Sequence, residues 1–305
     1  MHETRSRGEP RRRVRRWSVT WASAVTVPPT PVFAAAPMPV RVATSPPCRF
    51  VTMSTDSLCV IPARGGSTRI PRKNIKPFHG KPVIVWSIEA ALLSGCFSRV
   101  VVSTDDEEIA LVAREAGAEV PFLRPSSLAD AHTTLVEVTR HALEWFWRRG
   151  SRPDTVCQLM ATAPFVSAED LRSAGGSLGD ADYALTVTEY AFPVQRAVRI
   201  TDRNRLEMFS PEHFETRSQD LERAYHDAGQ FCLGTASAWL ARRVPFGTGT
   251  VPIVLPASRV QDIDTPEQWR QAERLFGLMR DTEEARSSAD RFPRQEMPGD
   301  DLRAA

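Results

Sequence analysis

The sequence predicts a doubly wound α/β fold, in which helices cover both faces of a mainly parallel sheet. Short apolar runs rich in β-branched residues alternate with longer segments whose apolar residues have helical spacing. That alternation is typical of parallel α/β domains. The chain has 305 residues, of which 42% are hydrophobic, so it can bury a sizeable core. We expect one domain over residues 57–280, with a small insertion over its ligand site.

The expected elements follow one another in a regular order. One strand ends in Asp105 and Asp106, an N-cap signature for a helix that we expect to end at Ala116. Residues 192–224 are less periodic, and we expect them to form either an insertion over the site or an arm used in dimerisation. The other expected elements are strands at 58–61, 100–102, 120–123, 156–159 and 251–255 and helices at 82–93, at 132–148, from about 167, and at 265–276.

Composition disfavours several classes of protein. The net charge is only +2, so there is no global field that would favour nucleic acid or a membrane. The five cysteines are odd in number and contain no CxxC pair, which argues for reduced thiols in the cytoplasm and against a disulfide framework or a zinc site. No apolar run approaches the roughly 20 residues of a membrane span. We therefore expect a soluble, cytoplasmic protein that binds neither nucleic acid nor a membrane.

The two ends of the chain differ from the domain between them. Residues 1–56 open with an arginine cluster and continue without helical or strand periodicity. A basic start followed by Ala34-Ala35-Ala36 resembles a secretory signal, but the middle of this segment is diluted by Ser and Thr. We favour a disordered extension, or sequence translated from a start upstream of Met53. Residues 281–305 are charged and contain proline, which is typical of a disordered tail.

Lysine is confined to one short window of the sequence. The three lysines are Lys73, Lys76 and Lys81, and arginine carries the rest of the positive charge. An ammonium group is a compact point charge that suits phosphate oxygens, whereas guanidinium is a broad planar fork. We expect a functional role for Lys73, leave Lys76 open, and expect Lys81 only to decorate a helix start.

A glycine-containing loop after the first strand carries the strongest functional signal. Gly65 and Gly66 let backbone N–H groups approach phosphate oxygens, while Arg64, Arg72 and Lys73 supply positive charge. In open α/β sheets ligands bind beyond the carboxyl ends of the strands, where this loop lies. Its spacing matches neither the P-loop nor the dinucleotide fingerprint, which disfavours ATPases and dinucleotide-dependent oxidoreductases. The loop therefore predicts a site for a nucleoside triphosphate.

Residues 61–74 resemble the signature loop of the cytidylyltransferases that activate sialic-acid-like sugars, and the resemblance extends over residues 58–276. It implies a nucleotide-diphospho-sugar transferase-like fold, with CTP and an acidic nine-carbon sugar as substrates, and we expect a homodimer. Arg124 matches the arginine that lies against the cytosine, although it is also a candidate surface arginine before Pro125. With the charge of the loop, the resemblance assigns catalysis to Arg64 and Lys73 and substrate binding to Ser67, Arg72, Asn74, Arg124 and Thr162.

Asp262 and Asp264 match the Asp-Ile-Asp element that binds magnesium in this family. Two carboxylates at alternate positions of an extended segment point the same way, which suits a hard cation. The resemblance implies a Mg²⁺ cofactor that would lower the pKa of the attacking sugar hydroxyl. Asp264 also precedes Thr265-Pro266, a favourable helix start, so it is a candidate N-cap as well as a ligand. Asp262 has no such alternative and is the stronger candidate ligand.

Residues 216–231 look like the branch of the family that acts on pseudaminic acid. They carry Ala228-Gly229, where enzymes acting on N-acetylneuraminic acid usually carry Asn-Gly. A bidentate guanidinium suits the sugar's carboxylate, and amide or imidazole groups suit its acetamido and hydroxyl groups. His226 has the open alternative of bonding only the backbone. The candidate sugar-binding residues are Arg196, Arg217, Gln219, His226 and Gln230.

The implied reaction joins CTP to pseudaminic acid and gives CMP-pseudaminic acid and pyrophosphate. Two alternatives remain open: the same reaction on N-acetylneuraminic or legionaminic acid, and a non-catalytic nucleotide-binding homologue. Three positions depart from the family pattern: Thr68 where lysine is usual, Met160 where a polar or aromatic residue is usual, and Cys232 where tyrosine is common. These departures bear on efficiency more than on identity, and the retained aspartate pair disfavours the non-catalytic reading.

Overall fold

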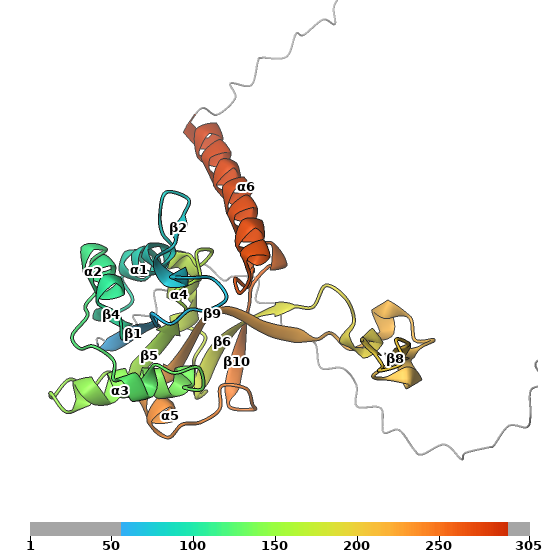
Figure 1. Cartoon of the computed structure of the whole chain (residues 1–305), viewed down its shortest axis with the longest axis horizontal. Coiled ribbons are helices and arrows are strands. Elements are labelled where there is room, and N and C mark those ends of the chain that lie inside the picture. The colour runs from blue at the N-terminus through green and yellow to red at the C-terminus, as the bar shows by residue number, and fades with distance from the viewer. Residues whose placement is uncertain (1–55, 292–305) are drawn as a thin grey trace, which may run out of the picture. The chain divides into compact units, whose positions relative to one another are not determined.

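A six-stranded sheet forms the centre of the described part of the chain. The computed structural model describes residues 56–291, with side chains up to residue 282. The strand order is β10-β6-β9-β5-β1-β4, and β9 is antiparallel to its neighbours while the others run parallel (Figure 1). The predicted mainly parallel sheet is confirmed. The strands are β1 (Ser57–Pro62), β4 (Arg99–Ser103), β5 (Thr155–Leu159), β6 (Tyr183–Glu189), β9 (Tyr225–Thr235) and β10 (Thr250–Val254).

Helices cover both faces of this sheet, as Figure 1 shows. On one face α1 (Val83–Ser94), α2 (Glu107–Glu115) and α4 (Ala168–Gly175) bury apolar side chains against the strands. On the other face α3 (Leu135–Trp147) and α5 (Ala236–Leu240) bury a second cluster. Because successive residues of a strand point to opposite faces, β1 contributes Cys59 and Ile61 to the first cluster and Leu58 and Val60 to the second. The doubly wound arrangement is therefore confirmed.

Side-chain caps fix where the helices begin. Asp106 caps α2 by accepting a hydrogen bond from the backbone N–H of Ile109, as its N-cap signature predicted. Thr134 and Glu137 form a capping box at the start of α3, so this helix begins at Leu135 rather than at the predicted residue 132. The helix predicted from about residue 167 is α4, which Ser167 caps.

Several other sequence-based expectations were wrong. Residues 120–123 form no strand; Glu119 and Leu123 make isolated parallel bridges to Val101 and Thr104, because Pro121 cannot donate a ladder hydrogen bond. Strand β6 was not predicted, and neither was the antiparallel strand β9, whose residues 225–235 carry a polar start and two glycines. The last helix, α6 (Pro266–Arg291), continues well past residue 280. The predicted leader over residues 1–56 lies, except for Asp56, outside the described residues.

A third apolar cluster attaches α6 to the loop after β1. Trp269 and Phe276 of α6 pack against Phe78, with ring centroids 5.5 and 5.3 Å away. Ile70 and Ile263 are buried in the same cluster. This packing brings the segment before α6 next to the glycine-containing loop, although the two lie far apart in the sequence. The loop also carries two short strands, β2 (Pro77–Phe78) and β3 (Lys81–Pro82).

Residues 190–224, which we call the arm, join β6 to β9. The arm contains the antiparallel pair β7 (Val198–Ile200) and β8 (Leu206–Met208), which Figure 1 places beyond the ends of β6 and β9 and away from the six-stranded sheet. None of the described helices combines the length and apolar character that a membrane crossing demands. The remaining elements are 3-10 turns: η1 (Lys73–Ile75), η2 (Ser126–Leu128), η3 (Val194–Arg196), η4 (Pro211–His213), η5 (Ser218–Asp220) and η6 (Ala257–Arg259).

Candidate active site

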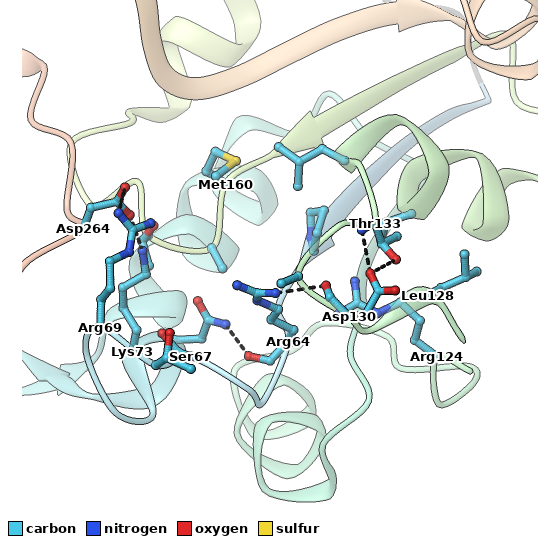
Figure 2. A pocket seen from close by; sticks show the side chains of 18 residues that line it. Arg64, Ser67, Arg69, Lys73, Arg124, Leu128, Asp130, Thr133, Met160 and Asp264 are labelled. Carbon is cyan, nitrogen blue, oxygen red and sulfur yellow. Dashed lines mark hydrogen bonds and ion pairs between the residues drawn. The ribbon is translucent and has the colours of Figure 1, made fainter. Parts of the chain in front are cut away.

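A pocket of about 400 Å³ opens where β1 and β5 end. Figure 2 shows Arg69, Lys73 and Asp264 together on one side of it, and Arg64, Asp130 and Thr133 on the other. The predicted residues that line it are Arg64, Ser67, Lys73, Asn74, Arg124, Thr162 and Asp264. The lining residues that we did not predict are Pro62, Thr68, Arg69, Leu128, Asp130, Ala131, Thr133, Leu135, Val138, Met160 and Ala161.

The loop after β1 is held by its own hydrogen bonds in the shape that forms the pocket floor. The Asn74 side-chain amide donates to the Arg64 carbonyl at 3.0 Å, which closes the loop between its first and last residues. A Cβ placed on Gly65 would come within 2.6 Å of Asp106 Oδ2, so this position accepts only glycine without a shift of the neighbouring carboxylate. The loop thus needs glycine for close packing against the residues after β4.

Arg64 reaches across the pocket. Its Nη1 donates to the backbone carbonyl of Asp130 at 2.9 Å. The Asp130 carboxylate in turn accepts hydrogen bonds from the backbone N–H groups of His132 and Thr133 at 2.9 and 2.7 Å. The hydrogen bond from the Thr133 hydroxyl is the largest cause of a lowered pKa of Asp130, and the two backbone bonds add to it. An Asx turn of this kind is recognisable in the sequence as a turn before α3, but the pattern does not show that the turn lines the pocket.

The second side of the pocket is an ionic cluster on Asp264. Lys73 Nζ lies 3.2 Å from Asp264 Oδ1 and donates to the Ile263 carbonyl at 2.8 Å. Arg69 Nη1 lies 2.8 Å from the other carboxylate oxygen. Two cations therefore share one carboxylate, and the side of the pocket keeps excess positive charge. Such a side suits a polyanion such as a triphosphate.

Lys76 and Lys81 contact aromatic rings outside the pocket. Lys76 Nζ lies 4.3 Å from the ring centroid of Trp269, and Lys81 Nζ lies 3.4 Å from that of Trp86. Lys81 also pairs with Glu89. Neither lines the pocket. Lys73 alone among them does, in keeping with the separate roles expected from the sequence.

Arg72 does not reach the pocket. Its backbone is left-handed, with φ of 54°, and its guanidinium pairs with Asp106 and Glu108 at the start of α2. The hydrogen bond from Arg72 is the largest cause of the lowered pKa of Asp106. The structure thus places Arg72 at the N-terminus of α2 and not among the residues that line the pocket, because the backbone turn directs its side chain to α2.

Arg124 is buried in the wall of the pocket. Its side chain is only 3% exposed, and its Nη2 lies 3.4 Å from Asp105 Oδ1. Burial lowers the pKa of Arg124, and Asp105 opposes that effect. Its Nε has no hydrogen-bond partner among the described residues. The alternative of a surface arginine is therefore wrong.

Thr265 caps α6, so the alternative of Asp264 as its N-cap is wrong. Thr265 Oγ1 accepts from the backbone N–H of Gln268 at 3.2 Å, and Gln268 Oε1 accepts from the N–H of Thr265 at 2.9 Å. Asp264 lines the pocket, whereas Asp262 is exposed and does not. No group of three or more His, Cys, Asp or Glu residues suited to a metal occurs in the described region. One or two carboxylates still fit Mg²⁺, which takes its other ligands from water and phosphates.

The sequence profile described as cytidylyltransferase matches residues 58–226, more than half of the chain. The chain belongs to the cytidylyltransferase family. A pseudaminic acid cytidylyltransferase from Campylobacter jejuni is 44% identical over 222 residues, which cover 72% of this chain and 96% of that protein. A CMP-N,N'-diacetyllegionaminic acid synthase from Legionella pneumophila is 34% identical, with 72% of this chain and 96% of that protein covered.

Solved structures support the fold of this cytidylyltransferase. A CMP:2-keto-3-deoxy-manno-octonic acid synthetase, solved in complex with CTP, superposes with a TM-score of 0.56 at 18% identity. The match covers 74% of this chain and all of the other. At this identity the shared feature is the fold rather than particular residues. Together the family and the fold make this protein a nucleotidyltransferase.

The predicted sugar-binding residues of this cytidylyltransferase lie outside its own pocket. Arg217 pairs with Asp220 at 2.7 Å, and the ring of His226 donates to the Asp227 carbonyl at 2.9 Å. Arg196 donates to the Thr216 carbonyl. Those three and Gln219 are exposed, while Gln230 is buried and donates to the Arg259 carbonyl at 2.7 Å.

Proposed function

We propose that this cytidylyltransferase transfers CMP from CTP to the anomeric hydroxyl of pseudaminic acid and releases pyrophosphate. The observation that carries the proposal is the 44% identity to the Campylobacter jejuni pseudaminic acid enzyme along 96% of that protein, against 34% for the legionaminic acid enzyme. The cationic pocket at the ends of β1 and β5 supports a triphosphate substrate.

Different residues of the pocket have different roles in the proposed reaction. Arg64, Lys73 and the amides of the loop neutralise the triphosphate, which lowers the barrier to attack on the α-phosphorus. The guanidinium of Arg124, a residue that lines the pocket, binds the base. The sugar hydroxyl attacks the α-phosphorus and loses its proton to water, and the bond to pyrophosphate breaks.

We propose Mg²⁺ as the cofactor, with Asp264 as the carboxylate that would hold it in the pocket and Asp262 as the second candidate. When bound, the ion would neutralise phosphate charge and acidify the sugar hydroxyl. Asp264 is 30% exposed, which leaves its oxygens accessible. The triphosphate would compete for Arg69 and Lys73 and so free this carboxylate from its present ion pairs.

We also propose a homodimer in which the arm contacts a second copy. The arm exposes a set of large apolar side chains that a monomer would leave in water. Arg196 and Arg217 belong to the arm and lie outside the pocket of their own chain. In the proposed dimer, these arginines bind the sugar's carboxylate at the pocket of the second copy. The exposed apolar residues include Phe192, Ile200, Leu206, Phe209 and Phe214, which are 82%, 71%, 73%, 63% and 72% exposed.

We propose a cytoplasmic location, with neither nucleic acid nor a membrane as a partner. The four cysteines of the described region are free thiols, in keeping with a reducing compartment. The near-zero net charge of +2 gives no drive toward polyanions. Fractionation of cells that express the full chain should recover it in the cytoplasmic fraction without salt extraction.

The decisive experiment measures pyrophosphate release with CTP and Mg²⁺ against pseudaminic, N-acetylneuraminic and legionaminic acids. We expect the largest kcat/KM with pseudaminic acid, by about a hundredfold or more, because a site built for one set of hydroxyl and acetamido groups leaves polar groups unpaired with another. A larger value with either other acid would move the chain to that branch. Binding of CTP without release of pyrophosphate in the presence of any of the three acids would favour the non-catalytic alternative.

A further inference from the structure

One oxygen of Asp105 holds two parts of the pocket together. Asp105 Oδ1 accepts a hydrogen bond from the backbone N–H of Gly65 at 3.1 Å and lies 3.4 Å from Nη2 of Arg124. Gly65 belongs to the loop after β1, and Arg124 belongs to the segment after α2. Asp105 itself follows β4, the edge strand between them. The loop after β1, which we call the triphosphate loop, and Arg124, the proposed base-binding residue, thus both contact the carboxylate of Asp105.

Arg124 depends on this contact. In the described part of the chain, Asp105 is the one acidic side chain within ion-pair distance of it. The guanidinium is 3% exposed, so loss of the partner charge would leave a buried cation uncompensated. The backbone of Arg124 is fixed independently, since its N–H donates to the Thr104 carbonyl at 2.7 Å. Removal of the carboxylate would therefore affect the side chain of Arg124 more than the path of its backbone.

The neighbouring carboxylate has a different task. Asp106 accepts from the N–H of Ile109 at 3.0 Å and pairs with Arg72, so it starts α2 and fixes the far end of the loop. Asp106 does not line the pocket. The two adjacent aspartates can therefore be compared directly, because one contacts Arg124 and the other contacts a helix N-terminus.

We propose that Asp105 is a positioning residue that sets the Arg124 side chain relative to the triphosphate loop and thereby makes the site select its nucleotide by the base. This inference rests on the proposed function in one respect, that Arg124 binds the base. Asp105 acts through Gly65 and Arg124 and does not itself touch the substrate. Its two contacts are separable, since the first needs only an acceptor atom and the second needs a charge.

The test uses binding to the full chain, with CTP, UTP and inorganic tripolyphosphate as probes. Tripolyphosphate occupies the loop without a base. In Asp105→Asn the amide oxygen can still accept from Gly65, so affinity for tripolyphosphate should stay within about twofold of wild type, while affinity for CTP falls about tenfold or more and the preference for CTP over UTP shrinks. In Asp105→Ala affinity for both tripolyphosphate and CTP should fall. The matched control is Glu119→Gln, which removes the exposed ion pair of Arg99 at the other end of β4 and should change neither.

A double-mutant cycle with Arg124→Gln tests the route of the effect. If Asp105 acts through Arg124, adding Asp105→Asn to Arg124→Gln should cost little further CTP affinity. Additive losses, or an Asp105→Asn variant that keeps wild-type discrimination between CTP and UTP while its Tm falls, would overturn the proposal. These measurements need no sugar. A wild-type protein that binds CTP but activates no sugar would therefore refute the proposed function, whereas the affinities for CTP, UTP and tripolyphosphate would still decide the role of Asp105.

Discussion

Lys73 and Asp264, which are 191 residues apart in the sequence, form an ion pair with Nζ 3.2 Å from Oδ1. The pair joins the loop after β1 to the segment before α6, which the cluster of Phe78, Trp269 and Phe276 holds in place. Each partner has a counterpart in the proposed substrates, because a phosphate would attract the ammonium and a phosphate-bound cation would attract the carboxylate. The contact is therefore one that substrate binding rearranges.

Lys73→Ala is expected to lower kcat/KM by about a hundredfold to a thousandfold, because the variant loses a cation that neutralises the developing charge on the phosphates. Lys81→Ala is the matched control. Its side chain pairs with Glu89 and stacks on Trp86, away from the pocket, so turnover should stay near wild type. Steady-state kinetics of pyrophosphate release compare the two. Equal losses at both positions would show that the lysine window carries no functional information.

Asp106 should make the protein sensitive to acid. The hydrogen bond from Arg72 lowers the pKa of Asp106 below its ordinary value of 3.8 in the folded state. The resulting stabilisation is complete above that ordinary value and is lost as the pH falls through the lower, folded value. Asp106→Asn keeps a cap for α2 but removes the titration. Urea unfolding from about pH 6 to about pH 2 should show a shallower acid loss of the free energy of unfolding in the variant. Parallel curves for both proteins would contradict this assignment.

Sequence patterns predicted the parts of this site that follow from local chemistry. The loop after β1 and the cap at Asp106 depend on neighbouring residues, and both were found where expected. The wall from Leu128 to Val138 was missed, because its link to the pocket is the contact from Arg64 to the Asp130 carbonyl. The direction of the Arg72 side chain, toward α2 and away from the pocket, was also not predicted, because it depends on a left-handed backbone that arginine does not favour.

The strands of the sheet also differ in whether a local sequence pattern predicts them. Most strands with β-branched apolar runs, such as β4, were predicted closely, because burial of both faces dictates their composition, although β6 was not predicted. Strand β9 was missed because it bends: its register against β6 shifts between Leu185 and Val187, and Gly229 in the same stretch has φ of 65°. Pairing with strands on both sides stabilises a segment whose own sequence favours a loop. Long-range pairing of this kind is not visible in a local pattern.

The arm provides a test of the proposed homodimer. Phe214→Ser should raise the dimer dissociation constant about tenfold or more, if the exposed ring is buried against a second copy. Leu93→Ser is the control, because Leu93 on α1 is equally exposed, at 72%, and lies outside the arm. Sedimentation velocity over a concentration series measures both. Unchanged association in Phe214→Ser would remove that ring from the interface, and a wild type that is monomeric throughout would contradict the dimer.

Complementation tests whether the arm serves its neighbour's pocket. Lys73→Ala damages the pocket, and Arg217→Ala damages only the arm, since Arg217 does not line the pocket of its own chain. If the arm completes the partner's site, a mixture of the two inactive variants should recover activity through hybrid dimers, in which one site has both intact parts. No recovery after demonstrated subunit exchange would show that each chain uses its own arm.

Asp264, Asp262 and Thr265 separate metal binding from helix capping. Asp264→Asn should keep the Tm, because Thr265 and Gln268 cap α6 without it, yet lose most magnesium-dependent pyrophosphate release, because an amide keeps the shape of the carboxylate but not its charge. Asp262→Asn should raise the magnesium concentration needed for half-maximal rate if this exposed carboxylate also contributes. Thr265→Ala should have the opposite effects to Asp264→Asn, because it should cost about 1 kcal/mol of stability while turnover is retained.

Thermal melts and magnesium titrations of all three variants test these expectations. Full activity of Asp264→Asn at an unchanged magnesium requirement would remove Asp264 from the metal site, and the same result for Asp262→Asn would leave the Asp-Ile-Asp segment without a catalytic role.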